Sequence, residues 1–383
     1  MPKPLAPASP TSFFPPQRTL LGPGPSEVHP RVLQAMARPT LGHLDPEFVR
    51  CMDEIKGLLQ YAFQTQNALT LPVSGPGTAG METCVVNLLE PGDTALVCIN
   101  GVFGKRLQHM VERCGARAIC LEQTWGEPVD PEQVEALLKA HPEICVVAFV
   151  HAETSTGALS DAKTLAALAR QYDCLSLVDT VTSLGGVPLY VDQWGLDAVY
   201  SGTQKCLSAP PGLSPITLSE RAQARIRQRK TPVQSWFLDL SLVMNYWGEG
   251  QQRTYHHTAP VNSLYALHEA LLMLQEEGLE SAWERHQTHH HQLRRGLEKL
   301  GIGFVVEKSY RLPQLNTVWV PRAYRDAEVR HYLLKAHNLE IGGGLGDFAG
   351  KAWRIGLMGY SSRSQAVQHC LMALEDALQD TLP

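Results

Sequence analysis

The stretch LSLVDTVTSLGGVPLYVDQWGLDAVYSGTQK, residues 175–205, contains two short apolar runs that we expect to be strands. The first run ends at Asp179, and the second run is followed by Lys205. Carboxyl ends of parallel strands meet at one edge of a sheet, where α/β proteins bind their ligands. A carboxylate buried there is costly without a cationic partner. The stretch therefore predicts that an acid and an amine share one rim of a sheet.

The alternation of strand and helix continues from this stretch back to about Cys51. Continuous apolar runs such as TALVCIN and EICVVAFVH alternate with amphipathic runs such as PEQVEALLKAH and DAKTLAALARQYD. Apolar strands alternating with helices are typical of an α/β domain with a mostly parallel sheet. The sequence predicts that fold class.

The length of 383 residues favours two domains. We expect an extended Pro-rich arm, a large domain and a smaller C-terminal α+β domain, at residues 1–18, 19–276 and 277–383. In the C-terminal part we expect two long helices, strands at FVVE (304–307), TVWVP (317–321) and AWRIGLMG (352–359), and a loop at IGGGLGDFAG (341–350).

Composition excludes several classes of function. The net charge of −5 and the 44% of hydrophobic residues indicate an ordinary globular enzyme rather than a nucleic-acid or membrane-surface protein. No apolar run is long enough to span a membrane, and no secretory signal is evident, so we expect a cytoplasmic location. The nine cysteines contain no C-x-x-C pair and are expected to be reduced. The histidines between His286 and His291 are expected on a solvated helix face without a metal.

Asp179 and Lys205 together fit pyridoxal phosphate (PLP) chemistry, although each alone has an ordinary structural explanation. PLP needs a lysine for covalent attachment and an acid that keeps its pyridine nitrogen protonated. The same lysine, once released, can move the α-proton of a substrate. The pair therefore makes PLP the expected cofactor.

The run SGPGTAG supplies a phosphate site, but it also spells the dinucleotide fingerprint G-x-G-x-x-G at Gly75, Gly77 and Gly80. A glycine-rich turn before a helix binds phosphate through free backbone N–H groups. The dinucleotide alternative requires an acid about 20 residues later. The following strand instead ends in Asn100 and Gly101. A site for a single phosphate is therefore the favoured interpretation, with Gly77 and Thr78 as donors.

Seven motifs together resemble the class V aminotransferases, most closely those of the alanine–glyoxylate and serine–pyruvate type. They are LLGPGPSEVHP, SGPGTAGMET, NGVFGKR, HAETSTGAL, the stretch from Asp179 to Lys205, YHHTAPVNSLYALHEAL and WRIGLMG. The resemblance runs in order from Leu20 onward. It implies a fold-type I PLP enzyme, a homodimer with active sites at the interface, and ping-pong transfer of an amino group. The donor would be alanine or serine, and the acceptor glyoxylate or pyruvate.

The resemblance also implies a role for each site residue. Lys205 would carry the cofactor and Asp179 would pair with its pyridine nitrogen. The other implied cofactor contacts are Gly77, Thr78 and Gln204 at the phosphate, Tyr255 and Thr258 at the phosphate of the other subunit, Thr154 at the phenolic oxygen, and Phe103 and Val181 on the two ring faces. Arg354 would bind the substrate carboxylate in a pocket lined by Gly24 and Ser183.

Two departures and two further alternatives accompany the resemblance. Phe103 stands where the animal enzymes have tryptophan, and Pro76 and Thr78 stand where they have serine and histidine. A class V transaminase for another donor, 3-hydroxykynurenine or 2-aminoethylphosphonate, stays open. A cysteine-desulfurase-like lyase would need a catalytic cysteine near the C-terminus, where Cys370 is the candidate.

Overall fold

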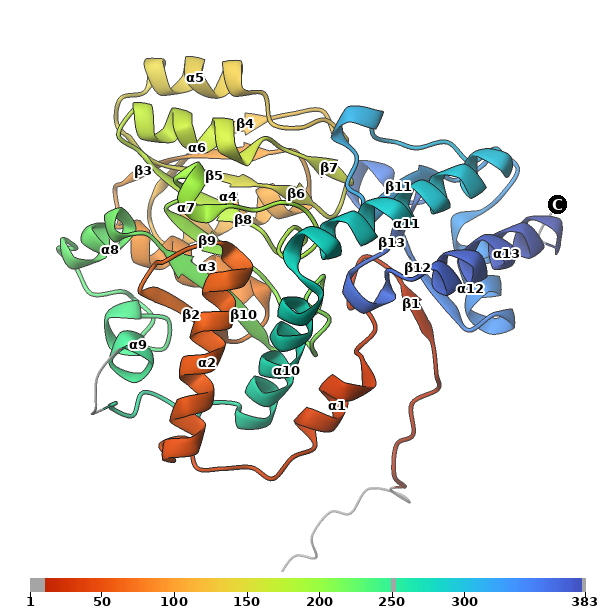
Figure 1. The fold of residues 1–383 in the computed structure, drawn as a ribbon. Helices are drawn as coiled ribbons and strands as arrows, with labels where there is room; N and C mark the ends of the chain where they lie inside the picture. Colours follow the sequence, from red (N-terminus) through yellow and green to blue (C-terminus); the bar gives the residue numbers. More distant parts are fainter. Residues whose placement is uncertain (1–10, 249–252, 381–383) are drawn as a thin grey trace, which may run out of the picture.

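The computed structural model describes residues 11–248 and 253–380 of the chain. A seven-stranded sheet forms its centre, in the order β2-β10-β9-β8-β5-β3-β4 (Figure 1). Only β10 runs antiparallel to its neighbours in this sheet; the other pairs are parallel. The predicted α/β class with a mostly parallel sheet is confirmed.

The elements of the large sheet follow one another along the chain. Its strands are β2 (Leu69–Ser74), β3 (Thr94–Ile99), β4 (Arg117–Glu122), β5 (Ile144–Val150), β8 (Leu175–Asp179), β9 (Ala198–Tyr200) and β10 (Leu213–Leu218). The helices between and around them are α1 (Pro30–Met36), α2 (Pro46–Phe63), α3 (Gly77–Leu88), α4 (Val102–Arg113), α5 (Pro131–Ala140), α6 (Ala162–Gln171), α7 (Val191–Trp194), α8 (Glu220–Arg227), α9 (Leu240–Trp247) and α10 (Val261–Glu277). A small hairpin of β6 (Ala152–Glu153) and β7 (Ala158–Leu159) follows β5.

Helices α3, α4, α5 and α6 pack against strands of the sheet, while α2 packs against β2 and α10 lies beside α2 (Figure 1). The strands β3, β5 and β8 are almost entirely buried, which is why the sequence shows them as continuous apolar runs. Their register sets Val150, Asp179 and Tyr200 side by side at the carboxyl edge. This register builds the rim that carries the site.

The C-terminal part contains a second sheet, in the order β1-β12-β13-β11. It consists of β1 (Thr19–Leu21), β11 (Leu315–Trp319), β12 (Leu339–Gly343) and β13 (Ala352–Gly356), with α11 (Leu279–Lys299), α12 (Asp326–Ala336) and α13 (Ser364–Asp380), and short 3-10 turns η1 (Lys308–Tyr310), η2 (Gly346–Phe348) and η3 (Gly359–Ser361). The expected arm ends where β1 begins, although residues 1–10 lie outside the described residues.

Three sequence expectations for this second sheet are wrong. Residues 19–21 were expected in the large domain, but β1 pairs with β12 because Leu21 is buried in the core of the small domain. The glycines of 342–343, expected in a loop, end strand β12, where a Cβ at Gly342 would lie 2.4 Å from Pro23. Phe304 makes only an isolated bridge, because the chain turns through η1 a few residues later.

The histidines of α11 also differ from expectation. His286 and His290 are buried rather than solvated; His286 hydrogen-bonds the Ala282 carbonyl and accepts from the backbone N–H of Gly359. Burial lowers the pKa of His286 to about 3, so this ring is neutral and structural. No group of metal-ligating side chains occurs within residues 11–248 and 253–380.

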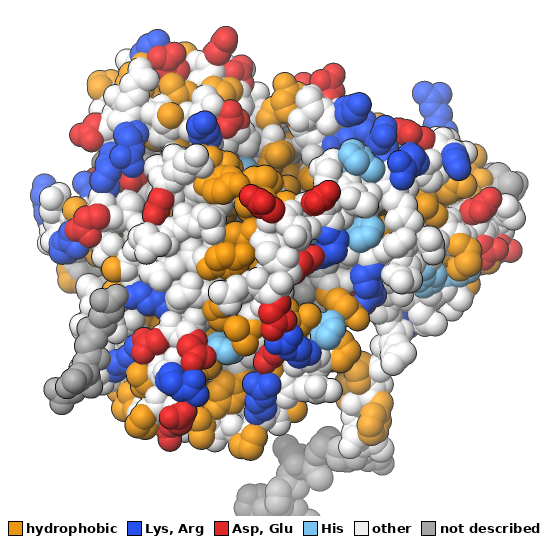
Figure 2. Space-filling model, in the orientation of Figure 1, with side chains coloured by type: hydrophobic (Ala, Val, Ile, Leu, Met, Phe, Trp, Pro, Cys, Tyr) orange, Lys and Arg blue, Asp and Glu red, His pale blue; other side chains and the backbone are white. Residues whose placement is uncertain are grey.

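All nine cysteines are free thiols, and Cys370 is fully buried in α13. Burial raises the pKa of Cys370 to about 12, which opposes formation of a reactive thiolate. In the described part of the chain, no helix has the length and apolar character needed to cross a membrane. On the face shown in Figure 2, acidic and basic side chains are mixed.

Candidate active site

Asp179 ends strand β8 and is 2% exposed. Its Oδ1 accepts from the backbone N–H of Val181 at 2.8 Å, and its Oδ2 accepts from the Tyr200 hydroxyl at 2.8 Å. Burial nonetheless raises the pKa of Asp179 to about 7. The carboxylate has two neutral donors and no cationic hydrogen-bond partner among the described residues. A protonated pyridine nitrogen is the type of partner that would stabilise its charge.

Lys205 lies five residues beyond β9, at the same edge of the sheet as Asp179. Its Nζ donates to the backbone carbonyl of Pro23, and its side chain is largely buried. Burial, followed by the positive charge of Arg354, lowers the pKa of Lys205 to about 8. The amine is therefore closer to its neutral, nucleophilic form than a solvated lysine is.

This pKa predicts how PLP uptake by the cofactor-free protein depends on pH. Attachment requires the neutral amine, so its rate should rise with pH through about 8 and level off above it. An unperturbed lysine would keep rising to about pH 10. Stopped-flow absorbance of PLP mixed with the cofactor-free protein measures the profile. A rate that still climbs tenfold between pH 9 and 10 would contradict the assigned environment.

Gly24 approaches the lysine so closely that a side chain does not fit. Its φ is +110°, and an added Cβ would lie 2.6 Å from Lys205 Nζ. The flanking backbone is held in place because Ser26 donates from its backbone N–H to the Gln204 carbonyl and from its hydroxyl to the Lys205 carbonyl. The structure thus places Gly24 beside the lysine; its role in the substrate pocket, which the resemblance implies, stays a prediction.

We expect Gly24→Ala to displace the amine and to weaken PLP retention by about tenfold, because backbone strain of this kind costs about 1–3 kcal/mol. Gly42→Ala is the matched control, since no atom lies within 4 Å of a Cβ at that position. Dialysis against buffer, followed by absorbance of the retained cofactor, compares the two variants. Equal PLP retention by the two variants would show that the close approach of Gly24 to Lys205 does not affect cofactor binding.

The glycine loop joins β2 to α3, as a phosphate site requires. Pro76 caps α3 without a side-chain hydrogen bond, so the first N–H groups of a twelve-residue helix are available. A Cβ at Gly77 would meet Val181 at 3.2 Å, and one at Gly80 would lie 1.9 Å from the Ser214 hydroxyl. The glycines therefore allow α3 to pack closely on the sheet beside Val181.

Arg106 contacts two of the predicted cofactor residues, and the sequence reasoning missed it. Its Nη1 donates to Thr78 Oγ1 at 3.0 Å, and its guanidinium lies 4.9 Å from the ring centre of Phe103. No ion pair of Arg106 occurs among the described residues. Since Thr78 accepts from Arg106, its own hydroxyl hydrogen is free to donate to another acceptor. The FGKR run could have indicated this contact, because Arg106 follows the predicted ring-stacking residue Phe103 by about one helical turn.

Several buried polar atoms around Lys205 have no partner in the structure. Gln204 Oε1 and Ser183 Oγ are buried and make no hydrogen bond within the described residues. Thr154 is buried and its hydroxyl bonds that of Thr182. Unpaired buried polar atoms next to a buried lysine favour a polar ligand at that place. Together with the uncompensated Asp179, they fit a phosphorylated pyridine cofactor.

Arg354 lies on β13 of the second sheet and is 6% exposed. Its Nε donates to the Gly343 carbonyl at 2.8 Å and its Nη1 to the Thr154 carbonyl at 3.2 Å. Burial lowers the pKa of Arg354 to about 10. Two carbonyls orient the guanidinium and leave donors unused, while no carboxylate of the described residues pairs with it. It is suited to bind a substrate carboxylate next to Lys205.

Tyr255 and Thr258 lie on the loop before α10, where the neighbouring His257 hydrogen-bonds to Ser74 at the end of β2. Tyr255 is 59% exposed, and its ring contacts that of His43. The two hydroxyls face each other at 3.4 Å, and neither bonds to a residue of the Lys205 site. Their expected role at the cofactor phosphate therefore requires a second subunit.

Comparison with known proteins decides the family. The family model for aminotransferase class-V matches residues 20–352. The chain is a class V aminotransferase. It is therefore a transaminase, and the cofactor of the alanine–glyoxylate type of this family is PLP.

Three relatives span nearly the whole chain. Alanine–glyoxylate aminotransferase of Oryctolagus cuniculus is 45% identical over 366 residues, covering 95% of this chain and 93% of that protein. The solved alanine–glyoxylate aminotransferase from Nostoc sp. has a TM-score of 0.94 at 48% identity and 97% coverage of both chains. The ureidoglycine–glyoxylate aminotransferase of Bacillus subtilis has a TM-score of 0.94 at 39% identity, covering 97% of this chain and 95% of that one.

Proposed function

We propose that this protein transfers the amino group of alanine to glyoxylate by a ping-pong mechanism. Near-full-length similarity to two alanine–glyoxylate aminotransferases carries the proposal, and the joint presence of Lys205, Asp179 and Arg354 in one buried site supports it. When bound, PLP supplies an electron sink for the negative charge that forms at the substrate α-carbon.

We assign a separate role in the reaction to each side chain of the site. Arg354 binds the carboxylate of the amino acid and then that of the 2-oxo acid. Lys205 would hold the cofactor through its Nζ, and the same amine, once released, would move the α-proton of the substrate, acting as general base and then as general acid. Asp179 keeps the pyridine nitrogen protonated, because its buried charge is stabilised only when a cation faces it. Phe103 and Val181 would contact the cofactor ring.

The carboxylate role predicts a selective loss in Arg354→Lys. Lysine is a point charge without the planar pair of donors, so we expect KM for alanine to rise by about 30-fold, which corresponds to about 2 kcal/mol. Initial rates over a range of alanine concentrations measure the change. Arg325→Lys, at an exposed position, is the control. An unchanged KM would place carboxylate binding elsewhere.

A donor–acceptor matrix separates the proposed activity from its alternatives. The donors are alanine, serine, (S)-ureidoglycine, 3-hydroxykynurenine and 2-aminoethylphosphonate; each is paired with glyoxylate, and every donor except alanine is also paired with pyruvate. The Bacillus subtilis relative is named for ureidoglycine, which makes that donor the second candidate. We expect the highest kcat/KM for alanine with glyoxylate. A higher value for any other pair would replace the proposed substrate while leaving the transaminase chemistry in place.

We propose further that the protein acts as a homodimer in which Tyr255 and Thr258 reach the phosphate site of the other subunit. Large apolar side chains near Tyr255 are exposed in the single chain, among them Trp236 at 59% and Leu44 at 46%. Exposed apolar groups of this kind mark interaction surfaces. Light scattering of the holoenzyme should give twice the chain mass. A cytoplasmic location is also proposed, on the sequence alone.

A further inference from the structure

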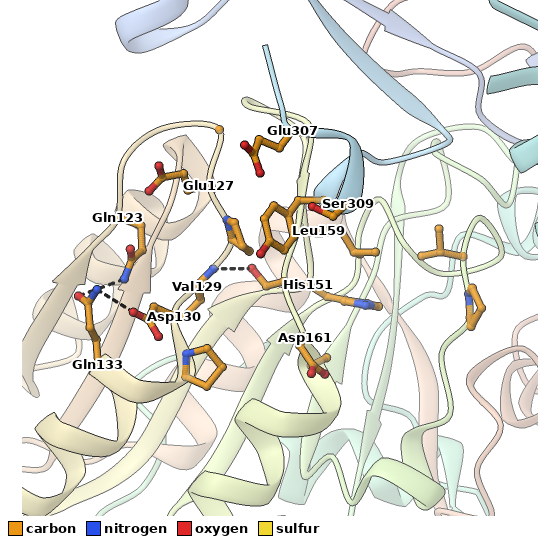
Figure 3. A pocket seen from close by; sticks show the side chains of 18 of the residues that line it. Gln123, Glu127, Val129, Asp130, Gln133, His151, Leu159, Asp161, Glu307 and Ser309 are labelled. Atoms are coloured by element: carbon orange, nitrogen blue, oxygen red, sulfur yellow. Dashed lines mark hydrogen bonds between the residues drawn. The ribbon is translucent and has the colours of Figure 1, made fainter. Parts of the chain in front are cut away.

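A cavity of about 870 Å³ lies beside the β6–β7 hairpin, and Leu159 of β7 is part of its lining (Figure 3). Its walls come from the ends of β4 and β5, the first residues of α5 and α6, α7, and the η1 turn of the small domain. Neither Lys205 nor any residue assigned above to the cofactor or substrate lines it. The proposed aminotransferase reaction leaves this cavity without a role.

His151 lies at the inner wall of the cavity and makes no side-chain hydrogen bond with any described residue. The side chain is 3% exposed, and its ring meets that of Trp194 edge-on, with 5.8 Å between centroids. Burial lowers the pKa of His151 to about 4, so the imidazole is neutral near pH 7. A ligand in the cavity that forms a hydrogen bond with His151 would satisfy this ring.

The charges around the cavity all have one sign. Four carboxylates line it, and no lysine or arginine does; they belong to Glu127, Asp130, Asp161 and Glu307. Asp130 and Asp161 cap α5 and α6 through backbone N–H groups. The side chains of Glu127 and Glu307, labelled at the upper end of the cavity in Figure 3, make no hydrogen bond or ion pair with any described residue. The cavity therefore favours a cation.

The remaining walls are apolar or aromatic. They include Leu159, Val187, Trp194, Tyr310 and three prolines. Tyrosine and tryptophan rings bind organic cations through their negative faces. An α-amino acid would bring its own carboxylate against four others, so the substrates of the enzyme do not fit.

We propose that this cavity is a second binding site, which takes a small organic cation: a protonated amine carrying an apolar or aromatic body. The acidic rim attracts the charge, Trp194 and Tyr310 contact the body, and the imidazole of His151 offers a neutral hydrogen-bonding group at the inner wall.

The probe for this site is N,N-dimethylbenzylamine, titrated calorimetrically into the PLP-loaded enzyme. Its protonated tertiary nitrogen can donate one hydrogen bond, and a tertiary amine cannot form an imine with the cofactor aldehyde. We expect saturable binding, weakened about fivefold in the double variant Glu127→Gln/Glu307→Gln and about tenfold in Trp194→Leu. Both glutamates are exposed, so the double variant is expected to fold normally. Glu375→Gln, an exposed carboxylate on α13 away from the cavity, is the matched control and should bind like the parent enzyme.

Phenylacetate, an anion of similar size, should not bind. Absence of saturable binding by the parent enzyme would overturn the proposal. Equal affinity of the parent enzyme and the double variant for the probe would also overturn it. So would a loss of affinity in Glu375→Gln as large as the loss in the double variant. Alanine–glyoxylate activity is measured separately, so failure of this site and failure of the proposed function are distinguishable.

Discussion

Replacing Lys205 by alanine is expected to lower alanine–glyoxylate turnover by about 10⁴-fold or more, because one residue both holds the cofactor and moves the proton. Its Nζ lies against the Pro23 carbonyl, and its pKa of about 8 suits it to both tasks. The variant should also lose the yellow chromophore that borohydride fixes to the parent protein. Stopped assays for pyruvate and mass spectrometry of the reduced protein measure the two losses.

Two further variants serve as controls for Lys205→Ala. Lys205→Arg keeps a positive charge but cannot become neutral near pH 7, so it should be as inactive as the alanine variant. Lys163→Ala removes an exposed lysine of α6 and should turn over like the parent enzyme. If Lys205→Ala retained a tenth of the parent kcat, the assigned role of this lysine would be wrong.

Asp179→Asn is expected to lower kcat by about 10²–10³-fold, since an amide cannot hold the pyridine nitrogen protonated by charge. Asparagine keeps the size of aspartate and leaves an oxygen that can accept from Tyr200 or Val181, so the fold should persist. Purified variant and parent are compared at saturating alanine and glyoxylate, with circular dichroism confirming the fold.

The control for Asp179 is Asp192→Asn, which removes another carboxylate that follows the same strand. Asp192 is exposed and accepts from Thr65 and from the backbone N–H of Gln66, which is a structural task. This variant should lose stability but not kcat. A parent-like kcat in Asp179→Asn would mean that the buried carboxylate is structural as well.

Sequence reasoning could predict the large sheet because its strands are buried on both faces and therefore appear as apolar runs. The position of Asp179 and Lys205 followed from the rule that parallel strands end at one edge, and the register of Asp179 beside Tyr200 agrees with it. The family assignment argues against the alternative interpretation of the glycine loop as a dinucleotide site. Burial of Cys370 likewise argues against a desulfurase-like cysteine.

Contacts between distant segments could not be predicted in the same way. The pairing of β1 with β12 joins residues more than 300 positions apart and rests on the burial of Leu21. The contact of Arg106 with Thr78 depends on how α3 and α4 pack, which no local pattern records. Glycines 342 and 343 obscured β12, because glycine is depleted in strands unless another segment approaches closely.

Transfer of a labelled amino group tests the central claim most directly. Purified holoenzyme is mixed with ¹⁵N-alanine and unlabelled glyoxylate, and the products are followed by NMR. The account predicts ¹⁵N-glycine and pyruvate in equal amounts, with neither formed by Lys205→Ala. Pyruvate without labelled glycine, or no reaction while another donor in the matrix is consumed, would contradict it.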